Sequence, residues 1–224
     1  LNRAEYSEYS DYAEHMKQAI VDGFLTPGHL PKHLMGAYVL AFAFGLVPEA
    51  LYPQFTAQLR TLLDDADDCV GTGFLATPFL LDVAEALYGA EAALRILMQT
   101  KQPSWLFEVE QGATAIWENW FAFSEQGEPQ KCSFDHYAFG CVDEWICRRL
   151  CGIDAAKPGF SHIQMRPMDN VPFDWSRTFV CEAGAITVTR TGETLYVTIP
   201  PNTTGTVSWH GNTCEIGSGS HTFG

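Results

Sequence analysis

Two short aromatic segments contain the residues best suited to chemistry. Residues 112–120 place Glu118 between Trp117 and Trp120, and residues 133–140 place His136 among further aromatic rings. Aromatic faces hold the apolar side of a pyranose ring, while a few polar groups bind its hydroxyls. One carboxylate among them can activate a water molecule. This mixture of residue types favours a sugar-binding site with hydrolytic chemistry.

Glu118 also has a structural interpretation. An ionised carboxylate in an apolar and aromatic stretch is costly to bury alone, so it needs either an ion pair or a chemical role. An Arg-paired or exposed glutamate at a helix edge would fit the pattern as well. Glu108 and Glu110 lie on the same segment and weaken the case for any one of the three.

His136 and three tryptophans are the candidates for sugar contact. His136 stands at the start of a predicted helix, where Asp135 or Ser133 is the expected N-cap, although a lone histidine is more often structural. Trp105, Trp117 and Trp120 lie near a glycine-containing loop, and loops rarely bury three indoles in regular order, which suggests a stacking surface. Burial in the core is the alternative for all three.

The composition describes a globular, acidic protein. The chain has 224 residues, of which 46% are hydrophobic, enough for one large domain or two small ones. Its formal net charge of -14 repels phosphate backbones and anionic lipids alike. The most apolar stretch, residues 34–47, is shorter than the roughly 20 residues that cross a bilayer. We therefore expect neither nucleic-acid nor membrane partners.

Neither the cysteines nor the acidic run predicts a metal site. The seven cysteines contain no CxxC pair, which favours structural free thiols in a reducing, cytoplasmic compartment over metal ligands. The acidic run at residues 64–68 lacks the ligand spacing of a calcium loop, so a solvated helix end is the better interpretation. We expect no metal and no cofactor.

Helical periodicity covers the first two thirds of the chain. Apolar residues on one face predict helices over residues 11–25, 33–46, 48–62, 77–88 and 90–100, and a last helix over 135–152. The single glycine between two of them, Gly89, suggests a helical hairpin. Residues 101–134 lose the periodicity and contain Pro103 and Gly112, so they are predicted as a long functional loop.

A different pattern begins after Pro158. Apolar and polar residues alternate over residues 162–166, 178–182, 185–190, 194–199 and 203–209, with turn residues between these runs. The alternation predicts a small antiparallel β-sandwich. The expected fold class is α+β with two domains, a partial toroid of helical hairpins over residues 1–158 and a β-sandwich over residues 159–224.

Five segments, residues 40–48, 72–81, 103–106, 112–120 and 133–140, resemble the C-terminal part of bacterial α-L-rhamnosidases of glycoside hydrolase family 78. They occur in that family's order. The resemblance implies that residues 1–158 are the C-terminal half of a catalytic (α/α)6 barrel, followed by the β-sandwich. The implied activity is inverting hydrolysis of terminal α-L-rhamnose, with a rhamnose-containing glycoside as the substrate.

Residue roles follow from the same resemblance. Glu118, in the family's Ile-Trp-Glu-x-Trp motif, is implied as the general base, and His136, in its Ser-Phe-x-His-Tyr motif, as a sugar ligand. Asn119 stands where the family often has arginine. The family's general acid lies on an earlier segment that has no counterpart here. We therefore expect an inactive fragment that needs a missing N-terminal barrel segment or a second chain.

Two other functions fit the residue pattern. A non-catalytic carbohydrate-binding or assembly module would keep the fold without the acid. Another (α/α)6 glycosidase, such as a glucoamylase-like enzyme, would share the barrel and differ in sugar specificity. Binding of L-rhamnose to the chain and to a Glu118→Gln variant tests the first alternative, and a panel of aryl glycosides tests the second.

Overall fold

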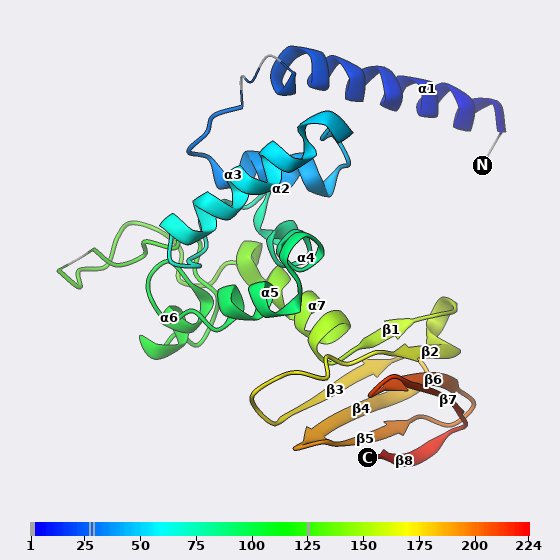
Figure 1. Ribbon diagram of the computed structural model, residues 1–224. Helices are drawn as coiled ribbons and strands as arrows, with labels where there is room; N and C mark the ends of the chain where they lie inside the picture. The colour runs from blue at the N-terminus through cyan, green and yellow to red at the C-terminus, as the bar shows by residue number, and fades with distance from the viewer. Residues whose placement is uncertain (1–2, 27, 29, 125) are drawn as a thin grey trace. The chain divides into compact units, whose positions relative to one another are not determined.

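The computed structural model describes residues 3–26, 28, 30–124 and 126–224 of the chain. The chain divides into two compact units, Leu1–Cys141 and Val142–Gly224 (Figure 1). The first unit is helical, and the second contains all the described strands. Within the described ranges, no helix combines the length and the apolarity required to span a membrane.

The division between the units lies at Cys141, whereas the sequence pattern places the domain boundary after residue 158. Residues 142–150 are bonded to the β-rich part of the chain. The Met168 N–H donates to the Leu150 carbonyl at 3.1 Å, and the Arg177 guanidinium binds the Asp143 carboxylate through two bonds of 2.7 Å. These helical turns therefore belong to the second unit, through contacts that periodicity does not reveal.

The first unit contains six α-helices in its described residues, which follow the predicted order with one addition. They are α1 (Arg3–Ile20), α2 (Met35–Ala43), α3 (Tyr52–Asp65), α4 (Thr77–Tyr88), α5 (Ala90–Leu97) and α6 (Trp105–Glu110), with short turns η1 (Val21–Leu25), η2 (Glu49–Leu51) and η3 (Ala138–Cys141). The bounds predicted for α4 are confirmed. Gly89, which follows it, has a φ of +87°, a conformation that glycine adopts without steric cost.

The added helix, α6, lies in the segment that was predicted to be a loop. Ser104 is its N-cap, and the Ser104 hydroxyl accepts a hydrogen bond from the Phe107 N–H at 3.1 Å. Such a cap satisfies one of the backbone donors that the first helical turn leaves unpaired. The prediction was wrong here because six residues are too few to show a helical period.

The core of the helical unit forms around α2, which packs against both α3 and α4, while α5 packs on α4. Val39, Leu59, Leu63, Leu80 and Ile96 are each at most 1% exposed. On α3 the buried residues are spaced by four, which places them on one face. On α3 the amphipathic pattern therefore selects the buried face, whereas the apolar residues Tyr12 and Met16 of α1 are 63% and 46% exposed.

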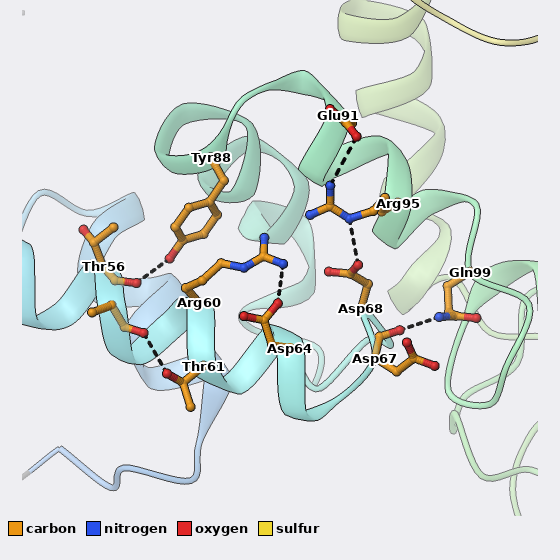
Figure 2. A network of polar contacts seen from close by, with 11 residues as sticks. Thr56, Arg60, Thr61, Asp64, Asp67, Asp68, Tyr88, Glu91, Arg95 and Gln99 are labelled. Carbon is orange, nitrogen blue, oxygen red and sulfur yellow. Dashed lines mark hydrogen bonds and ion pairs between the residues drawn. The ribbon is translucent and has the colours of Figure 1, made fainter.

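The acidic run forms the end of α3 and the turn that follows. The Asp68 carboxylate binds Arg95 of α5 at 2.9 Å, and the Asp67 carbonyl accepts from the Gln99 side chain (Figure 2). Asp64 pairs with an arginine one turn earlier on α3. The Asp64 and Asp68 carboxylates thus form ion pairs with arginines of the chain. The interpretation of the acidic run as a helix end is confirmed. No group of His, Cys, Asp and Glu among the described residues is arranged to hold a metal ion.

The second unit contains two four-stranded sheets. Their order is β1-β2-β6-β7 and β3-β4-β5-β8. The strands are β1 (Ile153–Ala155), β2 (His162–Met165), β3 (Trp175–Cys181), β4 (Gly184–Thr191), β5 (Thr194–Ile199), β6 (Thr204–Trp209), β7 (Asn212–Ile216) and β8 (Gly219–Phe223). The five predicted strands are confirmed with small shifts. The pair β2–β6 is parallel, so the sandwich is mixed and not purely antiparallel as predicted.

The last predicted helix, residues 135–152, is shorter and broken. It begins at η3 and continues as α7 (Val142–Trp145) and η4 (Ile146–Leu150). Gly152 then reverses the chain with a φ of +70°. All seven cysteines lie in the described part of the chain and form no disulfide, which agrees with the prediction of thiols.

Candidate active site

Backbone hydrogen bonds join the two segments that carry the candidate residues. The Glu118 N–H donates to the Ser133 carbonyl at 3.0 Å, and the His136 N–H donates to the Ile116 carbonyl at 2.8 Å. Segments 116–118 and 133–136 therefore lie side by side. The backbones that carry Glu118 and His136 are therefore neighbours in the fold.

An aromatic cluster connects this site to the core of the helical unit. Trp120 stacks on Phe139 with ring centroids 4.0 Å apart, and Trp105 meets Trp120 edge-on at 5.4 Å. Phe74 contacts Phe139 at 4.9 Å and stacks on His136 at 5.3 Å. Offset and edge-to-face ring pairs of this kind add to the free energy of burial. The cluster thus fixes both segments against the helices.

The three tryptophans are buried. Trp105, Trp117 and Trp120 are 5%, 4% and 6% exposed. The Trp105 Nε1–H donates to the Phe139 carbonyl and the Trp120 Nε1–H to the Thr72 carbonyl, each at 2.9 Å. Little of their ring faces is available to stack on a sugar in this chain, so they act as core residues that shape the site. Their contact with a sugar stays a prediction.

Glu118 is half-buried and held at one oxygen. Its Oε2 accepts a hydrogen bond from the Ser133 N–H at 2.7 Å. Its other oxygen has no protein partner among the described residues and is not sealed from solvent. Within the same ranges, no Lys, Arg or His forms an ion pair with it. An anchored carboxylate with one open oxygen can hold and deprotonate a water molecule.

His136 lies half-buried between two rings. Its imidazole stacks on Phe74 at 5.3 Å and on Tyr137 at 5.0 Å. Its Nδ1 accepts from the Ala138 N–H at 3.2 Å, so the proton of the neutral ring is on Nε2. Nε2 is then a donor suited to a sugar hydroxyl. The prediction of Asp135 or Ser133 as the N-cap was wrong, because the helical turn begins at Ala138 and the imidazole caps it.

Glu108 is a functional candidate that the sequence did not single out. It is 2% exposed, and burial raises its pKa from 4.5 to about 7, while the hydrogen bond from the Trp117 N–H opposes that shift. Its Oε2 accepts from this N–H at 3.2 Å, and its Oε1 is buried without a hydrogen-bond partner. Nothing in the sequence separates Glu108 from the exposed Glu110, because both are glutamates of one helix.

A polar hollow of about 720 Å³ lies beside the Glu118 segment. Its wall contains amide, aromatic and cationic side chains from Gln102, Asn119, Phe121, Phe123, Ser124, Gln130 and Lys131. Phe121 is 57% exposed. Amides and aromatic rings are the groups that commonly contact sugars. The hollow therefore has a lining that suits a ligand rich in hydroxyl groups.

Residues 1–150 of the 224 match the family model for the bacterial α-L-rhamnosidase six-hairpin glycosidase domain. The chain belongs to this family. The α-L-rhamnosidase of Streptomyces avermitilis is 31% identical over 96% of this chain and 24% of its own length. That of Formosa agariphila is 35% identical over 75% of this chain and 19% of its own length.

Solved structures of α-L-rhamnosidases have the same fold. The Streptomyces avermitilis enzyme, crystallised with L-rhamnose, superposes with a TM-score of 0.81 at 28% identity and covers 96% of this chain. The Aspergillus terreus enzyme superposes with a TM-score of 0.82 at 25% identity and covers 98% of this chain. The fold class is thereby confirmed. The chain spans about a quarter of the length of these relatives.

Proposed function

We propose that the protein containing this chain releases terminal α-L-rhamnose from glycosides by an inverting mechanism. Glu118 is the general base that activates water, and His136 binds the sugar through Nε2. The protein and its relatives share a family, and the relatives are named α-L-rhamnosidases. The chemistry requires two carboxyl groups and water.

The geometry of Glu118 is the observation that carries this proposal. Its Oε2 is fixed by the Ser133 N–H at 2.7 Å, while its other oxygen is open. A base in an inverting enzyme must stay ionised and must leave room for one water molecule in front of the anomeric carbon. An ion pair with arginine would have blocked this role. Arg60, Arg95, Lys101 and Arg177 bind other carboxylates instead.

The general acid is proposed to lie outside this chain. Inverting glycosidases place the acid and the base roughly 6.5 to 9.5 Å apart. Glu108, the buried carboxyl group nearest in sequence, contacts the backbone of Trp117 and so faces the base's own segment. Since the chain spans about a quarter of its relatives, a preceding barrel segment or a second chain is proposed to supply the acid.

Hydrolysis of p-nitrophenyl α-L-rhamnopyranoside by the complete protein tests the role of Glu118. We expect Glu118→Gln to lower kcat by about 10³-fold or more, because general base catalysis contributes 10² to 10⁴, and to leave L-rhamnose binding intact. Glu110→Gln is the matched control, since it makes the same chemical change at an exposed position. Turnover by Glu118→Gln at the wild-type rate would refute the assignment.

The stereochemistry and the need for a second segment are tested separately. Proton NMR of the first product should show β-L-rhamnose, the inverted anomer, before mutarotation. The 224-residue chain alone should not hydrolyse the chromogenic substrate, and clear turnover by it would contradict the proposed source of the acid. A complete protein that binds L-rhamnose and hydrolyses no rhamnoside would favour a non-catalytic carbohydrate-binding module.

A further inference from the structure

Glu108 occupies a position that stability alone does not explain. It is 2% exposed and its Oε1 is sealed without a hydrogen-bond partner. A buried polar atom left unpaired costs about 1–3 kcal/mol, and replacement of such a group by an apolar side chain of similar size is often neutral or stabilising. The carboxyl group must therefore supply something that a leucine would not.

What the Glu108 carboxyl group supplies is one hydrogen bond to the segment that leads to Glu118, in addition to a main-chain bond that any residue at position 108 would make. Its main-chain carbonyl accepts from the Ala113 N–H at 3.0 Å, and its Oε2 accepts from the Trp117 N–H at 3.2 Å. The segment between Ala113 and Trp117 has no regular secondary structure, so no ladder of hydrogen bonds holds it. Glu108 spans this segment from its start to the residue before the base.

The peptide group between Ile116 and Trp117 is held from both ends. Its N–H donates to Glu108 Oε2 at 3.2 Å, and its carbonyl accepts from the His136 N–H at 2.8 Å. The next N–H, that of Glu118, donates to Ser133 at 3.0 Å. Three of the four backbone polar groups from the Ile116 carbonyl to the Glu118 N–H are thus bonded. Glu108 provides the one bond of the three whose acceptor is a side chain.

We propose that Glu108 is the positioning residue of the general base, fixing the 116–117 peptide and thereby the direction of the Glu118 carboxylate. It does not contact the substrate. The inference rests on the proposed role of Glu118 and deepens it. A misplacement of about 1 Å in a reacting group can cost 10²-fold in rate, so loss of this bond should lower kcat while leaving sugar binding unchanged.

The first experiment compares three variants of the complete protein with p-nitrophenyl α-L-rhamnopyranoside. Glu108→Leu removes the acceptor and should lower kcat by about 10- to 100-fold, with KM within about threefold of the wild type. Glu108→Gln keeps an oxygen acceptor and should retain kcat within about threefold. Glu108→Asp withdraws the carboxyl by one methylene and should lose kcat like the leucine variant, which keeps the test open if Glu108→Leu does not fold. Wild-type kcat in both Glu108→Leu and Glu108→Asp would overturn the proposal.

The second experiment separates positioning of the base from general damage. In the Glu118→Ala background, sodium azide replaces water as the nucleophile and needs no base, so it should restore turnover. Adding Glu108→Leu there should change the azide-dependent kcat by less than about threefold, because no base remains to be positioned. An equal loss with and without Glu118 would overturn the positioning role alone. Full turnover by Glu118→Ala without azide would overturn the proposed function itself, and the inference with it.

Discussion

The site segment, residues 113–137, and the β-sandwich satisfy their backbones in different ways. In the sandwich, β3 is paired with β4 along its whole length in one continuous register. In the site segment, side chains accept single backbone N–H groups: Glu108 from Trp117, Glu118 from Ser133, and His136 from Ala138. The residues proposed for chemistry therefore also hold the local fold. A substitution in the segment should change function, and one in the sandwich should change stability alone.

The largest effect is expected from a substitution at Gly152, where the second unit has no room for a side chain. A Cβ added there would lie 2.1 Å from the Pro167 nitrogen and 2.6 Å from the Arg166 carbonyl oxygen. The positive φ adds a further steric cost. We expect Gly152→Ala to destabilise the second unit by about 4 kcal/mol, measured as a lowered thermal midpoint. Gly192→Ala is the control, since it has a positive φ but open space around it. Equal losses of stability in the two variants would show that the positive φ, and not the steric clash, causes the loss.

Phe139 tests whether the aromatic cluster supports the site segment. The side chain is 2% exposed and stacks on Trp120. Phe139→Ala should destabilise the helical unit by about 3 kcal/mol, and it should speed amide hydrogen exchange of residues 116–118. Phe139→Leu retains most of the volume and should have a smaller effect. Unchanged exchange in Phe139→Ala would mean that the segment is held by its hydrogen bonds without the cluster.

The raised pKa of Glu108 predicts that the local stability around Trp117 depends on pH, whereas that of the sandwich should not. Its pKa is raised from 4.5 to about 7 in the folded state, so between these values the folded protein keeps a proton that the unfolded chain has lost. Local stability should fall as pH rises through this window, by about 1 kcal/mol per pH unit, and should level off above it. Hydrogen exchange of the Trp117 amide measures the trend. Glu108→Gln should remove it, and a trend that persists in this variant would contradict its assignment to Glu108.

The smallest effect is expected on the exposed face of the sandwich. The Thr178 hydroxyl pairs with the Thr187 hydroxyl at 3.1 Å in an exposed position. Thr178→Ala leaves every ladder bond between β3 and β4 in place, so stability should change by less than about 0.5 kcal/mol. Thermal unfolding of the variant checks this. A loss of stability above about 1 kcal/mol would mean that side-chain hydrogen bonds stabilise the sandwich as they do the site segment.

Local patterns were sufficient for the longer elements. Helix α4 and strand β5 were predicted with the bounds that the structure has, because proline, glycine and regular spacing act within a few residues. Helix α6 and strand β7 were not predicted. The first is six residues long, and the second has four exposed residues in succession, so neither shows a period. The parallel pairing of β2 with β6 joins distant residues, which no local pattern encodes.

The residue types predicted a sugar site, because a carboxylate and an imidazole among aromatic rings suit the binding and hydrolysis of a pyranoside, and the roles of Glu118 and His136 stay predictions. Which of the acidic residues is buried was not readable. Glu108 and Glu110 differ by two positions on one helix, yet packing buries the first and exposes the second. The role of the tryptophans was likewise decided by distant contacts, such as the bond from Trp120 to Thr72. Composition and order specify the reactive groups, whereas burial depends on which remote segments fold against them, and burial determines their protonation and direction.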